Sequence, residues 1–349
     1  MKIPPVDPAA IRRASKILRS GGLVAVPTET VYGLAADAES EAAVRALFVA
    51  KGRPVDHPVI VHIEGADAIA DWARDVPDTA RALALAFWPG PLTLVLKRSP
   101  RAKNAVTGGQ DTVGLRASSH PWMRAVLDQF AGAVAAPSAN SFGRISPTTA
   151  QHVQADLGVK PRGKIDLILD GGPCSVGIES TIVDLSGDTP TLLRPGSITR
   201  EQLQHAIGMP VLDAGSDAPR TSGRLERHYA PRTPLAVMPA AELQARLARS
   251  VSARSDRLAV LAPLSVLQHS RMRVILAIAA SEFRDEYERS MYANLHRLDT
   301  SGAERLLIAA PPAGPEWDAV RDRLHRAEAG AGRSSEMASR LGTDYHSPA

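Results

Sequence analysis

The stretch that decides the fold reads Val26-Pro-Thr-Glu-Thr-Val-Tyr-Gly-Leu-Ala35, then a helical segment, then Lys51-Gly-Arg-Pro-Val-Asp-His-Pro-Val-Ile-Val-His62. An apolar run from Leu23 ends here in a polar turn, which is typical of a buried strand. The helical segment, 40–50, carries apolar residues on one face and ends at Lys51-Gly52. A second short apolar run ends on His62. Because α/β proteins usually bind ligands at the carboxyl ends of strands, these polar residues predict one shared pocket.

Composition narrows the class of protein. A length of 349 residues favours two domains, and 44% hydrophobic with 22% charged residues is typical of a globular protein. Only 4% of the residues are aromatic, which argues against single-strand nucleic-acid binding by base stacking. The net charge of +4 fits an anionic ligand. Cys174 is the only cysteine, so an intrachain disulfide and a Cys-rich zinc site are excluded. The sequence contains neither a signal-peptide pattern nor an apolar stretch of membrane-spanning length, so we expect a cytoplasmic protein.

The residue composition of the chain changes at residue 213, and we place the end of the first domain there. Residues 1–212 predict an α/β domain. Residues 213–234 are rich in Gly, Ser, Pro and Arg, which is typical of a linker. In 235–349, apolar runs alternate with helical stretches, which indicates a smaller parallel α/β domain. We expect its tail, from about 329, to fray.

Two helix predictions are specific enough to be tested by a structure. Ser146-Pro147 predicts a helix start, with Ser as the cap and Pro at the first helical position. A helix over 283–298 would have one apolar stripe, formed by Phe283, Tyr287, Met291, Leu295 and Leu298.

The common short catalytic motifs do not occur in this sequence. It has no phosphate-binding Gly-x-x-x-x-Gly-Lys-Ser/Thr loop, no Gly-x-Gly-x-x-Gly after a strand, no His-Glu-x-x-His and no Gly-x-Ser-x-Gly. Cationic and hydroxyl side chains remain at the ends of predicted strands, and such groups suit phosphate or carboxylate. They predict an anion site without a fixed general base, formed by Thr28, Thr30, Lys51, Arg53, His62, Arg116, Ser138, Asn140, Ser180, Thr181 and Arg194.

Each of these residues also has a purely structural interpretation, which spacing alone leaves open. Lys51 and Arg53 follow a helix and would complement its dipole. His62 would be a half-buried histidine with satisfied hydrogen bonds. The others would be turn formers (Ser138, Asn140) or surface ion-pair partners (Arg116, Arg194).

Ten short motifs, in one order, resemble a known family. They are Pro27-Thr-Glu-Thr-Val-Tyr-Gly-Leu34, Lys51-x-Arg-Pro54, Pro58-x-x-Val-His62, Pro89-Gly-Pro-Leu-Thr93, Thr112-Val-x-x-Arg116, Pro137-Ser-Ala-Asn140, Ser146-Pro-Thr148, Glu179-Ser-Thr181, Leu193-Arg-Pro-Gly196 and His228-Tyr-Ala-Pro231. The family is that of the YrdC-like threonylcarbamoyl-AMP synthases in their two-domain form. The resemblance is dense over about 8–232 and looser beyond. It implies an α/β fold: a YrdC-like twisted mixed sheet flanked by helices with a concave basic site, plus a smaller C-terminal Rossmann-like α/β domain.

The resemblance also implies an activity. Members of this family make L-threonylcarbamoyladenylate from L-threonine, bicarbonate and ATP, and they release pyrophosphate. This is the first step in forming threonylcarbamoyladenosine in tRNA. The family pattern implies Mg²⁺ carried by the ATP phosphates, with no dedicated metal ligands. It implies that the product passes to the enzyme that transfers the threonylcarbamoyl group to tRNA, without a stable nucleic-acid complex or a membrane.

Carried over by motif position, the resemblance assigns roles to single residues. Lys51 and Arg53 would be the catalytic residues, beside the phosphates. L-threonine would contact Thr30, His62, Arg116, Ser138 and Ser180, with its carboxylate on Arg116. ATP would contact Arg53, His57, Thr112, Asn140, Thr148, Arg194 and Tyr229.

Two positions depart from the family pattern. His57 stands where Asn is frequent, which adds pH sensitivity. In the linker, Thr221-Ser-Gly-Arg replaces Ser-Pro-Gly-Met, and without the Pro this turn should be looser.

The reaction that the resemblance implies needs alignment and charge neutralisation more than a base, and its intermediates hydrolyse easily. We therefore expect 214–232 to fold back over the pocket and to place Tyr229 on the nucleotide.

Three other functions fit parts of the sequence. A basic α/β surface would bind RNA without chemistry, although few aromatics and a net charge of +4 count against this. A related carbamoyl-adenylate step serves hydrogenase maturation, but it needs Cys-rich zinc modules that a single cysteine forbids. A structural subunit of a tRNA-modifying complex would tolerate Arg53→Ala, whereas we predict that this change abolishes function.

Overall fold

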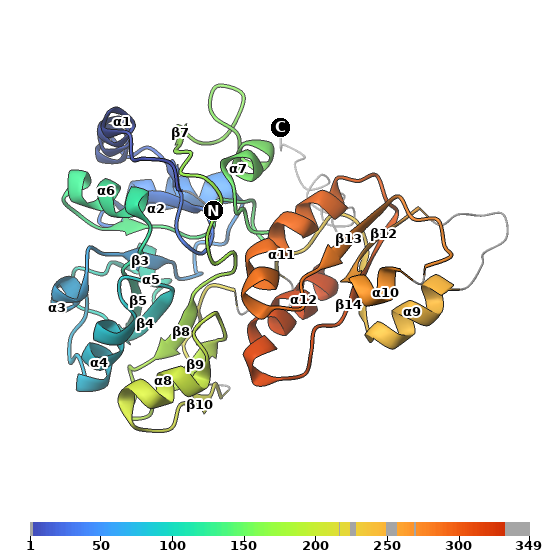
Figure 1. The fold of residues 1–349 in the computed structure, drawn as a ribbon. Helices are drawn as coiled ribbons and strands as arrows, with labels where there is room; N and C mark the ends of the chain where they lie inside the picture. The colour runs from blue at the N-terminus through green and yellow to red at the C-terminus, as the bar shows by residue number, and fades with distance from the viewer. Residues whose placement is uncertain (1–2, 216, 224–227, 249–256, 269, 332–349) are drawn as a thin grey trace, which may run out of the picture. The chain divides into compact units, whose positions relative to one another are not determined.

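The protein folds into two compact units (Figure 1). The first comprises Met1–Phe142 with Ser146–Arg224, and the second comprises Gly143–Ile145 with Leu225–Ala349. The computed structural model describes residues 3–215, 217–223, 228–248, 257–268 and 270–331. The tail that we expect to fray lies outside these residues from 332 onward, as do positions 216 and 224–227 of the predicted linker.

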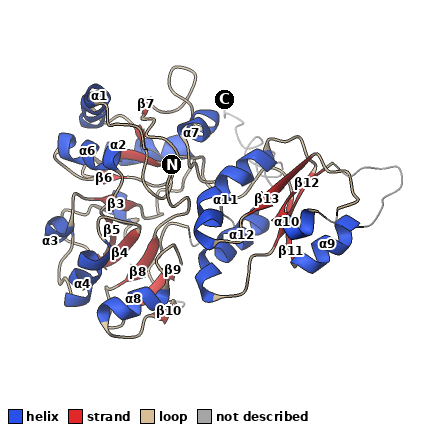
Figure 2. Cartoon of the chain, viewed as in Figure 1, coloured by secondary structure: helices blue, strands red, loops and turns tan. Residues whose placement is uncertain are grey.

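A ten-stranded mixed sheet forms the centre of the first unit (Figure 2). Its strand order is β10-β9-β8-β4-β5-β3-β6-β2-β1-β7. β3 pairs parallel with β5 and β4 pairs parallel with β8, whereas β4 and β5 are antiparallel. The strands are β1 (Val24–Val26), β2 (Gly33–Asp37), β3 (Ile60–His62), β4 (Leu92–Lys97), β5 (Thr112–Arg116), β6 (Val134–Ala135), β7 (Leu167–Ile168), β8 (Thr181–Asp184), β9 (Thr191–Arg194) and β10 (Leu212–Asp213).

Local sequence signals set the ends of the helices in this unit. α2 (Glu41–Lys51) begins at Ser40, whose hydroxyl accepts from the Ala43 N–H, and it ends at Gly52 in the left-handed conformation with φ 62°. α8 (Arg200–Ile207) begins with a capping box formed by Thr199 and Gln202. The other helical segments are α1 (Pro8–Arg19), η1 (Ala66–Ala68), α3 (Ile69–Trp72), α4 (Asp78–Phe87), α5 (Asn104–Thr107), α6 (Pro121–Phe130) and α7 (Ala150–Asp156).

The sheet is buried on both faces near its β1 edge. Ala25 belongs to the larger hydrophobic cluster, which extends under α2 and α4. Val24 and Val26 point to the other side, into a cluster that α1 and α6 complete. Because β1 is held between two cores, the polar turn that follows it at 27–30 has a fixed position.

The prediction of a helix starting at Ser146-Pro147 is wrong. α7 begins at Ala150, and its N-cap is Thr149, whose hydroxyl accepts from the His152 N–H. The Ser146 hydroxyl is buried and donates to Glu179 Oε1 at 2.5 Å instead. A long-range hydrogen bond therefore outweighs the local capping signal.

The second unit contains a four-stranded parallel sheet in the order β11-β14-β12-β13. Helices alternate with its strands, as the sequence predicts. Its elements are β11 (Leu235–Met238), α9 (Ala240–Ala248), β12 (Leu258–Pro263), α10 (Leu264–Leu267), β13 (Leu276–Ala280), α11 (Arg284–Asp299), β14 (Arg305–Ala309), η2 (Pro315–Trp317) and α12 (Asp318–Gly330).

The apolar stripe predicted for 283–298 is correct except at its first residue. Tyr287, Met291, Leu295 and Leu298 of α11 are buried. Phe283 precedes the helix and is 74% exposed, because it occupies the N-cap position and not the buried face. Among the described helices of both units, none has the length and hydropathy of a transmembrane span.

Candidate active site

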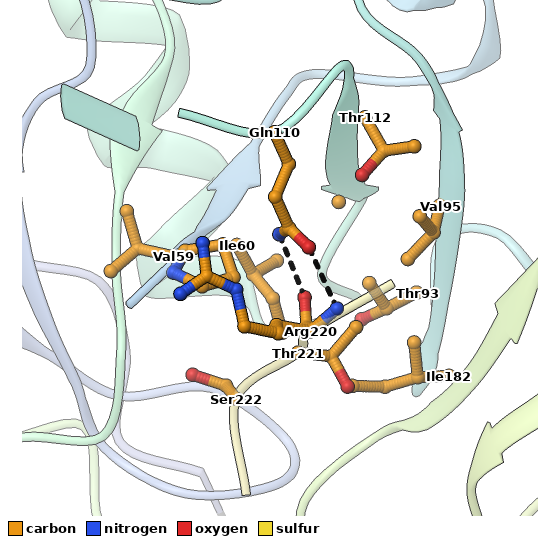
Figure 3. A pocket seen from close by; sticks show the side chains of 12 residues that line it. Val59, Ile60, Thr93, Val95, Gln110, Thr112, Ile182, Arg220, Thr221 and Ser222 are labelled. Atoms are coloured by element: carbon orange, nitrogen blue, oxygen red, sulfur yellow. Dashed lines mark hydrogen bonds between the residues drawn. The ribbon is translucent and has the colours of Figure 1, made fainter. Parts of the chain in front are cut away.

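A cavity of the first unit lies over one face of four neighbouring strands, β8, β4, β5 and β3 (Figure 3). Side chains alternate between the faces of a strand, so Thr112, Gly114 and Arg116 of β5 share this face. The space measures about 310 Å³, part of it open to solvent. We call it the sheet pocket. It is lined by Pro58, Val59, Ile60, Thr93, Val95, Gln110, Thr112, Gly114, Ile182, Arg220, Thr221 and Ser222.

Arg116 ends β5, and its guanidinium is held by the turn that follows β1. Its Nη1 donates to Thr30 Oγ1 at 2.9 Å, and its Nη2 donates to Glu29 Oε1 at 2.7 Å. The Arg116 and Glu29 side chains are each only 5% exposed. This is a buried ion pair and not the surface pair that the structural interpretation of the sequence offered.

His62 ends β3 and is the register partner of Arg116. It is buried, and among the described residues its Nδ1 has no hydrogen-bond partner. Burial, and then the charge of Arg116, lower the pKa of His62 to about 3. The imidazole is therefore neutral at physiological pH and keeps one nitrogen for another partner.

Ser180 and Arg194 meet at the β8 edge of the same face. Arg194 donates from Nε and Nη2 to the Ser180 carbonyl at 3.1 and 2.9 Å, and from Nη2 to the Ser180 hydroxyl at 3.2 Å. The Ser180 hydroxyl is also 2.8 Å from the Thr93 hydroxyl of β4. Arg194 is thus a buried, aligned cation and not a surface ion-pair partner.

Ser222 of the predicted linker lies between the two arginines that the resemblance assigns to ATP. Arg53 Nη2 donates to the Ser222 hydroxyl at 3.0 Å, and Arg194 Nη1 donates to the Ser222 carbonyl at 2.8 Å. Residues 220–222 line the sheet pocket, where Gln110 binds the backbone of Arg220 (Figure 3). Arg53 and Arg194 therefore converge on a single point, although 141 positions separate them.

Lys51 is the last residue of α2, and it is buried among backbone carbonyls. Its ammonium donates to the carbonyls of Ser138 and Asn140, each at 2.5 Å. The Ser138 hydroxyl donates to Asn140 Oδ1 at 2.6 Å. Burial, and then the nearby Arg53 charge, hold the pKa of Lys51 well below its usual range. Lys51 thereby ties the segment after β6 to the end of α2, beside Arg53.

The remaining predicted ATP contacts are more dispersed. His57 is half-buried and packs edge-on against Phe142, with ring centroids 5.5 Å apart. Thr148 is buried, and its N–H donates to His152 Nδ1 at 3.3 Å. Tyr229 belongs to the second unit, where the Arg323 guanidinium lies 5.3 Å from its ring centroid. The contacts of these three residues with ATP stay predictions.

Sequence reasoning missed four residues that hold this arrangement together. Glu29 pairs with Arg116, Thr93 contacts Ser180, and Gln110 and Ser222 fix the linker. Among these four, only Glu29 could have been found from the sequence. It lies in a turn beside predicted anion-binding residues, where a carboxylate needs a cationic partner. The other three depend on contacts between distant segments.

Family models match nearly the whole of the described chain. The Sua5/YciO/YrdC model, described as telomere recombination, matches residues 16–196. The Sua5 C-terminal model, described as the C-terminal domain of threonylcarbamoyl-AMP synthase, matches residues 198–329.

The chain belongs to the Sua5/YciO/YrdC family.

Members of the Sua5/YciO/YrdC family from distant organisms are similar in sequence and in structure. The threonylcarbamoyl-AMP synthase of Pyrococcus abyssi is 43% identical over 233 residues, which cover 65% of this chain and 67% of that protein. The enzyme of that name from Bacillus subtilis is 44% identical over 232 residues, covering 65% of this chain and 66% of its own length. The sequence alignments thus span about two thirds of these relatives. The crystal structure of P. abyssi Sua5 complexed with L-threonine superposes with a TM-score of 0.85 at 33% identity, covering 94% of this chain and 97% of that one. The predicted fold class, a YrdC-like mixed sheet with a smaller parallel α/β domain, is confirmed.

Proposed function

We propose that this protein synthesises L-threonylcarbamoyladenylate from L-threonine, bicarbonate and ATP, with release of pyrophosphate. Family membership and the names of the relatives support this activity. The observation that carries it in the structure is the sheet pocket. Arg116, at the end of β5, binds Thr30, while Arg53 and Arg194 converge on Ser222, which lines the pocket. Such an arrangement suits a small carboxylate and a polyphosphate held end to end.

The threonine end would be formed by Arg116, Thr30, His62 and Ser180. A guanidinium binds a carboxylate through two parallel N–H donors, so Arg116 would take the carboxylate of threonine. The neutral His62 would accept or donate one hydrogen bond without repelling the ammonium group of the amino acid. Ser138, held by Asn140, would add a hydroxyl.

The nucleotide end would be formed by Arg53, Arg194, Thr112 and Asn140, with Lys51 supporting Asn140. ATP phosphates would replace Ser222 on the two arginines. Mg²⁺ would travel on those phosphates. The side chains gathered here are cations, hydroxyls and amides, and the two Glu29 oxygens are already engaged by Arg116 and Ser118. This donor set fits the phosphates and not a metal ion directly.

The chemistry then requires positioning more than proton transfer. The threonine amine adds to bicarbonate with loss of water and gives a carbamate. A carbamate oxygen forms a bond to the α-phosphorus, the bond to the bridging oxygen breaks, and pyrophosphate leaves. Arg53 and Arg194 would stabilise the negative charge that develops on the leaving group. Enclosure by residues 220–222 and their neighbours would limit hydrolysis of the labile carbamate.

The product would pass to the enzyme that transfers the threonylcarbamoyl group to tRNA, in the cytoplasm. Neither the synthesis of the product nor its transfer to that enzyme requires this protein to form a stable complex with RNA. The alternative of an RNA-binding module without catalysis is not favoured, because Arg116 and Arg194 are buried and engaged by protein groups and do not form an exposed basic surface.

A pyrophosphate-release assay tests this function. The full-length protein is given ATP, Mg²⁺ and bicarbonate, with or without L-threonine, and L-serine serves as the matched amino acid. We expect release that requires L-threonine and is weaker with serine. Release that is indifferent to the amino acid, or none at all together with salt-sensitive RNA binding, would reject the proposal.

A further inference from the structure

The guanidinium of Arg116 is oriented by a carboxylate that has no assigned role. Glu29 Oε1 accepts from Arg116 Nη2 at 2.7 Å, and the hydroxyl of Ser118 donates to Glu29 Oε2. Burial alone would raise the pKa of Glu29, but the charge of Arg116 and the hydrogen bonds from Ser118 and Arg116 hold it below its usual value. Glu29 is therefore an ionised carboxylate clamped between a cation and a hydroxyl.

The donors of Arg116 can be counted. A guanidinium has five N–H groups. Nε donates to the Gly90 carbonyl at 3.3 Å, one N–H of Nη1 goes to Thr30, and one of Nη2 goes to Glu29. Among the described residues, the guanidinium has no further hydrogen bond. One N–H on each terminal nitrogen is left, and a carboxylate binds a guanidinium through two such donors.

The guanidinium of Arg116 is thus held by three contacts, with Gly90, Thr30 and Glu29. They fix the plane of the guanidinium and the direction of its two remaining N–H donors. Glu29 is the only charged member of the three, so it forms the strongest of these contacts. It belongs to the turn at 27–30, which follows the doubly buried strand β1 and is itself buried. The position of Arg116 is in this way tied to a buried part of the fold.

We propose that Glu29 is a positioning residue for L-threonine, which aims the two remaining N–H donors of Arg116 at the substrate carboxylate. This proposal rests on the proposed function. Both Glu29 oxygens already accept hydrogen bonds from protein groups, so in this proposal Glu29 acts on threonine indirectly. Its effect reaches the substrate through Arg116 alone, so it acts on threonine and leaves ATP binding unaffected.

The test compares Glu29→Gln with Glu39→Gln. Glutamine keeps the size of Glu29 and one acceptor oxygen but removes the negative charge. The guanidinium of Arg116 is then oriented less strongly. Glu39 pairs with Arg101 on the surface at 2.7 Å and is the matched control. We expect Glu29→Gln to raise the KM for L-threonine about tenfold with the KM for ATP within twofold of wild type, and Glu39→Gln to change neither. An unchanged or lowered KM for threonine, or equal rises in both KM values, overturns the proposal.

Ser118→Ala keeps the test decisive if Glu29→Gln does not fold. It leaves the Glu29–Arg116 pair in place and removes only the hydroxyl behind it, so we expect a rise of about threefold in the KM for threonine alone. Calorimetric titration of L-threonine into each folded variant separates this proposal from the function. If the wild-type protein binds threonine but releases no pyrophosphate, the function fails. The Glu29 proposal then stands or falls on whether threonine affinity drops in the variants.

Discussion

The side-chain amide of Gln110 pairs with both backbone polar groups of Arg220. Gln110 Oε1 accepts from the Arg220 N–H at 2.7 Å, and Gln110 Nε2 donates to the Arg220 carbonyl at 3.0 Å (Figure 3). The Arg220 side chain adds a contact to the Gly108 carbonyl at 3.0 Å. Gln110 lies in the loop before β5, so a side chain of this loop binds the backbone of the linker. The two hydrogen bonds hold residues 220–222 over the sheet pocket.

Loss of this pairing should loosen the linker. Each of the two hydrogen bonds contributes about 1 kcal/mol net, so Gln110→Ala should lower the free energy of local opening by about 2 kcal/mol. We expect the Arg220 amide to exchange its hydrogen at least about tenfold faster, measured by hydrogen–deuterium exchange. Gln129→Ala, an exposed site on α6, is the control. Unchanged exchange over 219–222 in Gln110→Ala would show that other contacts hold the linker.

Arg53→Ala should abolish useful turnover by weakening the nucleotide end. The guanidinium is buried and donates to the Pro58 carbonyl at 2.8 Å and to Ser222, a place that the phosphates would take. Removing a charged hydrogen-bond donor costs about 2–3 kcal/mol, so we expect kcat/KM for ATP to fall roughly 100-fold. Threonine affinity should stay the same. Arg45→Ala, which removes an exposed pair with Glu41, should be silent. A functional Arg53→Ala protein would instead support the structural-subunit hypothesis.

Gly114→Ala should fill the sheet pocket without disturbing the fold. A Cβ at this position would lie 3.6 Å from Thr93 Cγ2 and 3.7 Å from Ile60 Cγ1, which are ordinary van der Waals distances. The added methyl group would occupy space that a ligand of the pocket needs, so the ligand would bind less tightly. We expect the KM for ATP to rise about tenfold at an unchanged melting temperature. Gly187→Ala adds its methyl to open space and serves as the control. An unaffected KM in Gly114→Ala would place the nucleotide elsewhere.

His62 should make the folded state sensitive to acid. Its folded-state pKa of about 3 lies below the unfolded value of about 6.5, so the folded state binds fewer protons between these two values. Its contribution to stability is complete above pH 6.5 and is lost as the pH falls toward 3. Between pH 7.5 and pH 5, this loss amounts to about 2 kcal/mol of unfolding free energy.

Urea unfolding at these two pH values measures the effect. His62→Gln should lose about 2 kcal/mol less than wild type between pH 7.5 and pH 5, because glutamine does not titrate. Equal losses in the two proteins would mean that His62 is not held neutral by burial and by Arg116.

The sequence was most informative where local rules decide the structure. The apolar run from Leu23 contains β1, the run that ends on His62 contains β3, and the helical segment 40–50 contains α2. Local rules failed at Ser146, where the hydroxyl finds Glu179 across the fold. The strand order could not be derived from periodicity, since β6 lies between β2 and β3 and pairs with strands far from it in the chain, such as Ala36 with Ala135 and Val61 with Ala135.

The residues of the candidate site also fall into two groups, those that the sequence predicted and those that it did not. Arginines at strand ends, such as Arg116 and Arg194, were found because a strand fixes where its last side chain points. Their partners were not found, because Glu29 and Ser222 lie in loops far from the arginines in the sequence. The resemblance located the motifs, and the structure supplied the contacts between them.

A crystal structure with L-threonine and a non-hydrolysable ATP analogue tests the central claim most directly. We predict that the threonine carboxylate lies on the two remaining donors of Arg116, that the phosphates contact Arg53 and Arg194, and that Ser222 has left these arginines. Nucleotide bound away from the sheet pocket, or threonine bound without Arg116, would contradict the account.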